Sequence, residues 1–203
     1  MAQSRETVML PEPVYADDKS VEGLLWQRRS VRDYQDATLQ LSDISQLLWA
    51  AQGITHAAGL RTAPSAGALY PLELYVVAGN VNDLAAGVYH YQAEGHRLAR
   101  MHGGDQRKPL AQAALAQNWV SDAAAVVVFA AMYERTKRKY GQRGIRYVHM
   151  EVGHAAQNLF LQAEALGLAT VVVGAFRDDE VAGVLQLPAD VRPLALMPIG
   201  RSQ

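Results

Sequence analysis

The sequence contains no cysteine among its 203 residues. Disulfide bonds, thiolate metal sites, cysteine nucleophiles and CxxC redox pairs are therefore excluded. If this protein transfers electrons, a group other than a thiol must carry them. A chain of this length can bury roughly 70% of the surface that its unfolded form exposes, so a hydrophobic core can form without such cross-links.

A large excess of one charge is also missing, because 19 basic residues stand against 20 acidic ones and the formal net charge is -1. Proteins that mainly coat nucleic acid or an anionic membrane normally carry a basic excess. We therefore expect neither a nucleic acid nor a membrane as the partner of this protein.

Long hydrophobic runs are absent as well. The longest apolar run, residues 123–132, is about half of the roughly 20 residues that a membrane-spanning helix needs. Residues 1–19 contain acids and prolines where a secretory signal needs a basic start and a continuous apolar stretch. We interpret the protein as cytoplasmic, with an N-terminal arm of residues 1–19 and a single domain of residues 20–203.

Hydrophobic periodicity predicts helices near both ends of the chain and strands between them. The expected helices span residues 21–29, 41–51, 147–166 and 178–187, and Ser42 is the expected N-cap of the second. The expected strands span residues 72–78, 87–91, 96–101, 124–131, 170–173 and 194–199. The helix 147–166 is apolar around most of its circumference, which predicts a central position or a subunit interface. This pattern predicts an α+β domain around a mostly antiparallel sheet.

Metal and nucleotide motifs are not found. His149, Glu151 and His154 resemble HExxH, but the two histidines are five residues apart and so diverge by about 140° on a helix. A helical zinc site needs its histidines at i and i+4. We interpret these residues as polar positions on a packed helix and expect no metal. GxGxxG, GxxxxGK[ST] and GxSxG motifs are also missing.

Two basic clusters each allow two interpretations. The first is QRRSVR at residues 27–32; the second, at residues 134–147, has six basic residues and one acid, within an expected loop from Tyr133 to Arg146. A charge run is often only a solvated face. Arginine also binds phosphate through two parallel hydrogen bonds, so a cluster of arginine and serine suits a phosphorylated cofactor.

Two segments of small residues could approach a ligand closely. Residues 61–71 read RTAPSAGALYP, with a glycine for close approach and two prolines that fix the shape. A tight entry into the strand at Leu72 explains this segment equally well. Gly174 follows a predicted strand and could present backbone NH groups to a ligand.

The two basic clusters and the two segments of small residues, in their order along the chain, resemble the FMN-dependent nitroreductase family. Within it they resemble the branch of SagB/ThcOx-type dehydrogenases. The most specific segments are RRSVRDY from Arg28, LLWAAQGIT from Leu47, LRTAPSAGALYPLELY from Leu60 and ERTKRKYGQRGIRYVHMEVGHAAQNLFLQAEALGL from Glu134. The resemblance covers nearly the whole chain from Ser20. It implies a nitroreductase-like fold, with a central antiparallel sheet flanked by helices, in an intertwined homodimer that holds two FMN molecules at the subunit interface.

The resemblance also implies which residues bind FMN. The phosphate, ribityl chain and pyrimidine edge would be held by Arg28, Arg29, Ser30 and Arg32. The partner subunit would supply Pro64, Ser65, Ala66, Gly67 and Leu69. The remaining contacts would come from Gln117 or Asn118 on the pyrimidine, from Val173, Gly174 and Ala175 beside the flavin N5 and O4, and from Arg201 on the phosphate.

The activity implied by the resemblance is a ping-pong hydride transfer. NAD(P)H would reduce the flavin at N5, and a small acceptor such as a nitroaromatic, quinone or enone would then occupy the same face. Guanidinium groups of Arg28 or Arg32 would stabilise the negative charge of the reduced flavin.

Lys139 and Tyr140 leave a second activity open. Azole-forming members of the branch carry a Lys-Tyr pair, which these two residues match in order and context. Either could act as the general base when a peptide azoline is oxidised to an azole. The simpler interpretation is that both lie on a solvated basic loop. A non-catalytic binding module that uses this basic stretch is opposed by the near-neutral total charge.

Overall fold

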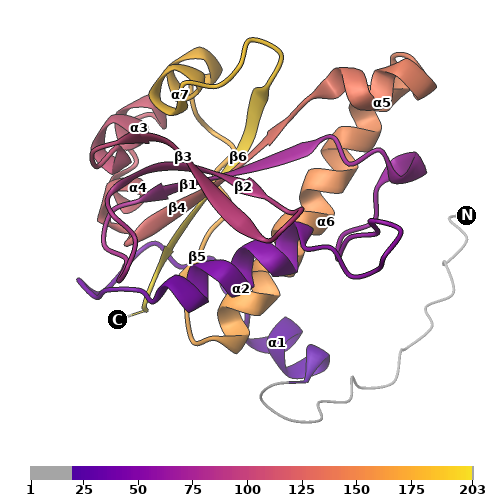
Figure 1. Cartoon of the computed structure of the whole chain (residues 1–203). Coiled ribbons are helices and arrows are strands. Elements are labelled where there is room, and N and C mark those ends of the chain that lie inside the picture. Colours follow the sequence, from indigo (N-terminus) through magenta and orange to yellow (C-terminus); the bar gives the residue numbers. More distant parts are fainter. Residues whose placement is uncertain (1–19, 203) are drawn as a thin grey trace, which may run out of the picture.

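The computed structural model describes residues 20–202 (Figure 1). The predicted arm of residues 1–19 lies outside the described residues. The helices are α1 (Val21–Gln27), α2 (Leu41–Gln52), the 3₁₀ turn η1 (Ala66–Ala68), α3 (Arg107–Ala113), α4 (Asn118–Asp122), α5 (Tyr133–Tyr140), α6 (Arg143–Ala165) and α7 (Asp178–Leu185). The strands are β1 (Leu72–Ala78), β2 (Gly87–Gln92), β3 (Arg97–Gly103), β4 (Ala125–Ala131), β5 (Ala169–Thr170) and β6 (Arg192–Gly200).

The six strands form one sheet in the order β3-β2-β1-β4-β6-β5. Every neighbouring pair is antiparallel. The predicted α+β class and antiparallel sheet are therefore confirmed. β4 lies between β1 and β6 and all seven of its residues are buried, which fits its nearly continuous run of alanine and valine.

Side chains of β4 alternate between two hydrophobic cores, because successive residues of a strand point to opposite faces of the sheet. Val127 and Phe129 belong to the core that contains residues of α2 and α6. Val126 and Val128 belong to the core that contains residues of α3, α4 and α7. Figure 1 shows the two layers of helices on either side of the sheet. The sheet is thus covered on both faces.

Several predicted boundaries were wrong. The N-cap of α2 is Gln40 rather than Ser42, and its backbone NH donates to the carboxylate of Asp43 at 3.0 Å. α6 begins at Arg143, four residues before the predicted start. Only Ala169–Thr170 pairs as a strand in the region predicted as 170–173, although Val173 forms an isolated bridge with Leu196.

The expected loop from Tyr133 to Arg146 is also wrong, because residues 133–140 form α5. Within this helix only Thr136 is buried, and five of the eight residues in its sequence YERTKRKY are charged, so it lacks the apolar residues by which a core-facing helix is predicted. α3 and α4 were missed for a related reason, since each has seven residues or fewer and such short segments carry a weak periodic signal.

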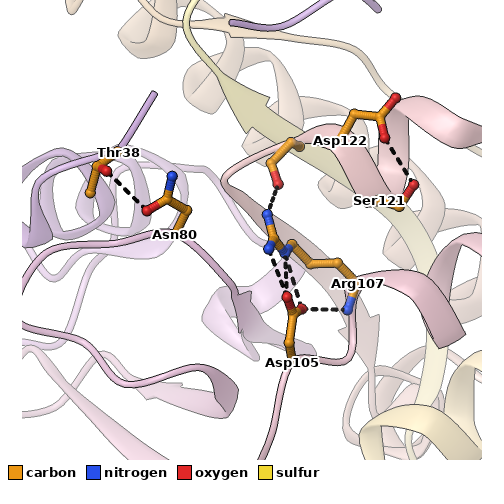
Figure 2. Close-up of polar contacts among 7 residues, drawn as sticks. Thr38, Asn80, Asp105, Arg107, Ser121 and Asp122 are labelled. Carbon is orange, nitrogen blue, oxygen red and sulfur yellow. Dashed lines mark hydrogen bonds and ion pairs between the residues drawn. The ribbon is translucent and has the colours of Figure 1, made fainter. Parts of the chain in front are cut away.

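Polar side chains fasten the connections at one end of the sheet (Figure 2). Arg107 donates through Nη1 to the carbonyl of Ala123 at 2.7 Å, and its Nε donates to Asp105 at 3.0 Å. Thr38 Oγ1 donates to Asn80 Oδ1 at 2.9 Å. Hydrogen bonds of this kind satisfy loop groups that the strands leave unpaired.

Residues 20–202 contain no helix with the length and apolar character that crossing a membrane requires.

The segment from Val31 to Gln35 closes the edge of the sheet at β5 and β6. The backbone NH of Val31 donates to Thr170, and the NH of Gln35 donates to Arg201, both at 3.0 Å. Tyr34 is buried between them. A Cβ on Gly200 would lie 2.7 Å from Cδ1 of the Tyr34 ring, so only glycine leaves room for this ring.

We expect Gly200→Ala to lower the free energy of unfolding by about 1–3 kcal/mol, because the added methyl displaces a buried ring. Urea denaturation measures this change. The control is Gly183→Ala in α7, where no atom lies within 4 Å of the added Cβ; it should be neutral or stabilising by up to about 1 kcal/mol. Equal stability of the two variants would contradict the assigned packing.

Candidate functional site

The first group of predicted site residues lies along the β5–β6 edge. Val31 pairs with Thr170, and Thr170 pairs with Ile199 of β6. Arg201 follows this strand, and its carbonyl accepts the hydrogen bond from Gln35. The structure therefore brings residues 28–32 and Arg201, which are far apart in the sequence, to the same end of the sheet.

The arginines of this group carry positive charge that the described part of the chain leaves uncompensated. The Arg28 guanidinium lies 4.7 Å from the centre of the Phe160 ring, and that of Arg32 lies 5.7 Å from the Trp119 ring. Arg29 donates to the carbonyls of Trp26 and Arg28 at the end of α1. Within residues 20–202, none of Arg28, Arg29 and Arg32 forms an ion pair. Such an arrangement favours an anion.

Arg201 differs from the other three because the carboxylate of Asp43 lies near its guanidinium group. Its Nη2 lies 3.8 Å from Oδ2 of Asp43. This distance is longer than a hydrogen bond, so the guanidinium keeps its donors for another acceptor. Ser30, between the arginines, is exposed and adds a hydroxyl to the group.

The segment Val173, Gly174 and Ala175 lies beside the same edge. Val173 exchanges backbone hydrogen bonds with Leu196 of β6, whereas Gly174 and Ala175 are exposed. Gln117 holds this segment, because its Nε2 donates to the Ala175 carbonyl at 2.7 Å. The amide nitrogen of Gln117 is thus engaged with the protein, and its oxygen stays available to a ligand.

The second group of predicted residues forms a separate loop, residues 64–69, packed against α6. Ser65 Oγ accepts a hydrogen bond from the backbone NH of Tyr70 at 2.9 Å and donates to Oε2 of Glu151 at 2.6 Å. Pro64, Ser65 and Ala66 line a cavity of about 280 Å³. The other side chains that line this cavity come from α6: Tyr147, Met150, Glu151 and His154.

Left-handed backbone occurs within this loop and at Tyr70, the residue that follows it. Gly67, Ala68 and Tyr70 have φ values of 65°, 53° and 45°. Glycine adopts this left-handed region freely, but Ala68 and Tyr70 do so at a cost of order 1–3 kcal/mol each. Such a conformation persists only where the surroundings hold it, as is common in segments that grip a ligand.

Two arginines hold Tyr70, where the loop ends. The Arg61 guanidinium lies 4.6 Å from the centre of the Tyr70 ring, and the backbone NH of Arg61 donates to the Tyr70 hydroxyl. Arg135 of α5 donates through Nη1 to the Tyr70 carbonyl at 2.9 Å and forms an ion pair with Glu73. His90 of β2 contacts the other carboxylate oxygen of Glu73 at 2.6 Å. The sheet thereby supports the strained loop.

Lys139 and Tyr140 lie at the tip of this loop. A Cβ placed on Gly67 would be 2.8 Å from the Tyr140 hydroxyl and 3.0 Å from Lys139 Nζ. The prediction that both lie on a loop was wrong, since they are the last two residues of α5. The helix brings both polar groups to the segment that, by the family resemblance, is expected to pack against the flavin.

The two groups are not joined to one another within a single chain. The first touches α6 at Phe160, and the second touches it at Glu151. Nine residues of helix separate these positions by about 14 Å. In residues 20–202 no hydrogen bond or ion pair links the two groups. The two groups of predicted site residues, which we term the two partial sites, therefore lie at different positions along α6.

Glu151 is the functional candidate that the sequence interpretation missed. It was assigned to the polar positions of a packed helix, yet only 3% of the residue is exposed and its Oε1 has no hydrogen-bond partner among the described residues. The helical spacing of the sequence could have indicated this burial, because residue 151 shares the face of α6 that carries the apolar residues Val148 and Ala155. A carboxylate on a buried apolar face is rare unless it is paired with another group.

The residues of the first group fit the phosphate and polar edge of FMN by their chemistry. The three arginines without ion pairs and the Ser30 hydroxyl supply donors for a phosphate. The open backbone at Gly174 offers space beside them, since no atom lies within 4 Å of a Cβ built there. The described residues contain no cluster of three histidines or carboxylates suited to a metal ion.

Comparison with known proteins establishes the family. The nitroreductase family model matches residues 25–201. MJ1384, a provisionally named nitroreductase of Methanocaldococcus jannaschii, is 47% identical over 194 residues, covering 96% of each protein. A provisionally named nitroreductase structure from Ralstonia eutropha JMP134 matches with a TM-score of 0.80 at 29% identity, covering 96% of this chain and 88% of that one. The chain belongs to the nitroreductase family and is an oxidoreductase.

A more distant relative supports the predicted branch. The microcin B17-processing protein McbC of Escherichia coli is 30% identical over 143 residues, which are 63% of this chain and 48% of McbC. The resemblance to SagB-type processing proteins is thus confirmed as a distant similarity. Members of the nitroreductase family typically bind FMN and are typically dimeric.

We expect the contacts of Glu73 to make stability depend on pH. Burial raises the pKa of this carboxyl, but the His90 hydrogen bond and the Arg135 charge outweigh burial and hold its pKa below 4.5. A lowered pKa in the folded state stabilises the protein above the unfolded pKa, and this contribution is lost as pH falls through the folded pKa. Glu73→Gln should therefore cost about 1–3 kcal/mol at neutral pH and less below about pH 4.

Urea denaturation of both proteins across this pH range measures the effect. The control is Glu134→Gln, because Glu134 pairs with Lys137 while 61% of its side chain is exposed; it should change stability by under about 1 kcal/mol at every pH. A cost of Glu73→Gln that stays constant with pH would refute this account of Glu73.

Proposed function

We propose that this protein is an FMN-dependent oxidoreductase that takes hydride from NAD(P)H and passes the electrons to a small organic acceptor in a ping-pong cycle. Nitroaromatics, quinones and enones are the proposed acceptors. The observation that carries the proposal is the backbone pairing of residues 31–35 with Thr170 and Arg201, which brings the segments of Arg28, Arg32 and Arg201 to the β5–β6 edge. Bound FMN would supply a ring nitrogen that accepts and returns hydride.

Each residue of this edge has a proposed role. Arg28, Arg29, Ser30, Arg32 and Arg201 bind the phosphate and the polar edge of the ring. The oxygen of Gln117 and the backbone of residues 173–175 orient the ring, because the Gln117 amide already fixes Ala175 in place. Fixed donors of this kind need no rearrangement during reaction, which is why they stabilise developing negative charge well.

We further propose a homodimer with FMN at the subunit interface, to which the second copy contributes residues 64–69. The separation of the two partial sites along α6 supports this arrangement, since one chain by itself leaves both incomplete. Large hydrophobic side chains that remain exposed also support it. They are Val21, Leu25 and Trp26 of α1, Trp49 of α2 and Met150 of α6. Exposed apolar side chains of this size are typical of interaction surfaces.

A second candidate is the oxidation of an azoline to an azole in a peptide-derived substrate. The placement of Lys139 and Tyr140 against Gly67 supports it, together with the similarity to McbC. In this reaction substrate carbon would lose a hydride to FMN and a neighbouring position would lose a proton, and oxygen would then reoxidise the reduced flavin. The Lys139 amine or the Tyr140 hydroxyl would accept that proton.

We expect the purified protein to bind FMN and its visible flavin absorption to bleach with NADH or NADPH under anaerobic conditions. Arg32→Ala should weaken FMN binding about 10- to 100-fold, the loss expected for one charge-assisted hydrogen bond. Arg192→Ala is the control, because this exposed arginine lies at the opposite end of β6. A protein that stays colourless after incubation with FMN would refute the proposal.

Lys139→Ala and Tyr140→Ala distinguish the two candidate activities. If the protein is an azoline dehydrogenase, both variants should retain FMN, and the variant that removes the general base should lose at least about 100-fold in the rate of azole formation, the usual contribution of such a base. Mass spectrometry of a thiazoline peptide detects this as a loss of two hydrogens. If the protein is a reductase, both variants should keep NAD(P)H-driven reduction of a quinone within a few fold. No azole product with the unaltered protein would exclude the second candidate.

A further inference from the structure

Glu151 and Ser65 form a buried pair next to the proposed flavin-contacting loop. Ser65 Oγ donates its only hydrogen to Glu151 Oε2 at 2.6 Å and accepts the NH of Tyr70 at 2.9 Å. A hydroxyl has one hydrogen and two lone pairs. With both contacts formed, Ser65 has one remaining lone pair and no hydrogen for a ligand.

The surroundings of Glu151 leave its charge poorly compensated. Its second oxygen is buried without a hydrogen-bond partner in the described structure. Burial raises the pKa of Glu151 to about 7, while the Ser65 hydrogen bond and the Arg61 charge act in the opposite direction. The other polar groups around it are Tyr147 and His154 of α6, which line the same cavity, and Lys139 and Tyr140 of α5, which reach the loop at Gly67.

We propose that Glu151 is a positioning residue that decides whether the Ser65 hydroxyl donates or only accepts a hydrogen bond at the cofactor. The ionised carboxylate takes the Ser65 hydrogen. The protonated acid can instead donate its own hydrogen to Ser65 Oγ, so that the Ser65 hydrogen turns toward the cavity. The change from carboxylate to acid takes up one proton from the solvent, and no other group is consumed.

The consequence for FMN follows from its atoms, and this step rests on the proposed function. The flavin ring and the phosphate present mainly hydrogen-bond acceptors, and the ring has a single NH donor at N3. A Ser65 hydroxyl that can donate therefore suits more positions of FMN than one that can only accept. We expect FMN to bind more tightly when Glu151 is protonated.

The experiment measures the dissociation constant of FMN for the full-length protein and for Glu151→Gln. The pH runs from about 5.5 to about 8.5, on either side of the Glu151 pKa of about 7. Glutamine is neutral at every pH and keeps an oxygen and an NH₂ donor in the same place. The ratio of the two constants, unaltered protein over variant, should be near 1 at the low end and rise to about 3–10 at the high end, because a single hydrogen bond is gained or lost. Titration of the FMN phosphate affects both proteins alike and cancels in this ratio.

Two further variants separate positioning from a general effect of charge or folding. Glu164→Gln changes another carboxylate of the same helix, which is not fully buried, and its ratio should stay near 1 throughout. Ser65→Ala removes the hydroxyl through which Glu151 acts, so its own dissociation constant should lose the pH dependence that Glu151 imposes. The ratio of unaltered protein over Ser65→Ala should therefore rise with pH, as it does for Glu151→Gln. This second variant also tests the inference if Glu151→Gln fails to fold.

The outcomes are distinct. If FMN binds normally but the ratio of unaltered protein over Glu151→Gln does not change with pH, the role of Glu151 is overturned and the proposed function stays intact. Retention of the full pH dependence in Ser65→Ala would also overturn it, because Glu151 would then act without Ser65. Failure of every protein to bind FMN at any pH would overturn both proposals.

Discussion

The packing of α6 against the sheet is the constraint on which the rest of the structure depends. Val148, Ala155, Leu159 and Ala163 form a fully buried stripe along this helix, in the same core as Val127 and Phe129 of β4. Burial of a large apolar side chain stabilises a fold by about 1.5–3 kcal/mol, so several such residues fix the helix firmly. Because a helix of 23 residues is a rigid spacer, its packing also sets where Glu151 and Phe160 lie, and with them the two partial sites.

Different physical means hold the two partial sites. The β5–β6 edge depends on backbone pairing, with Val31 and Gln35 attached to Thr170 and Arg201, so its arginines project from a regular framework. The loop of residues 64–69 has no such pairing; its backbone is left-handed at Ala68 and again at Tyr70, directly after the loop. Its conformation is held by side chains instead: Glu151 through Ser65, and Arg61 and Arg135 through Tyr70. A cofactor between the two would meet a stable surface on one side and a strained, hydrogen-bonded one on the other.

Much of the fold could be predicted where a physical pattern repeats. β1 was located to the residue, and β4 to within one residue, since long runs of buried valine and alanine have few alternatives. α5 could not be found in this way, because five of its eight residues are charged and only Thr136 is buried. The role of Glu151 was missed for a different reason. A carboxylate in a helix is usually exposed, and its partner Ser65 is 86 residues away in the sequence.

By itself the sequence determined the class of fold, the family resemblance and the residue types available for chemistry: arginines without cysteines, and a loop of small residues. Local patterning suffices for these because period and composition are properties of neighbouring residues. Only the tertiary structure decided which of these residues meet. It joined Arg201 to the arginines near α1, placed Lys139 and Tyr140 against Gly67, and buried Glu151 under Ser65. Contacts between residues so far apart along the chain depend on how the sheet and α6 pack, and no local pattern carries that information.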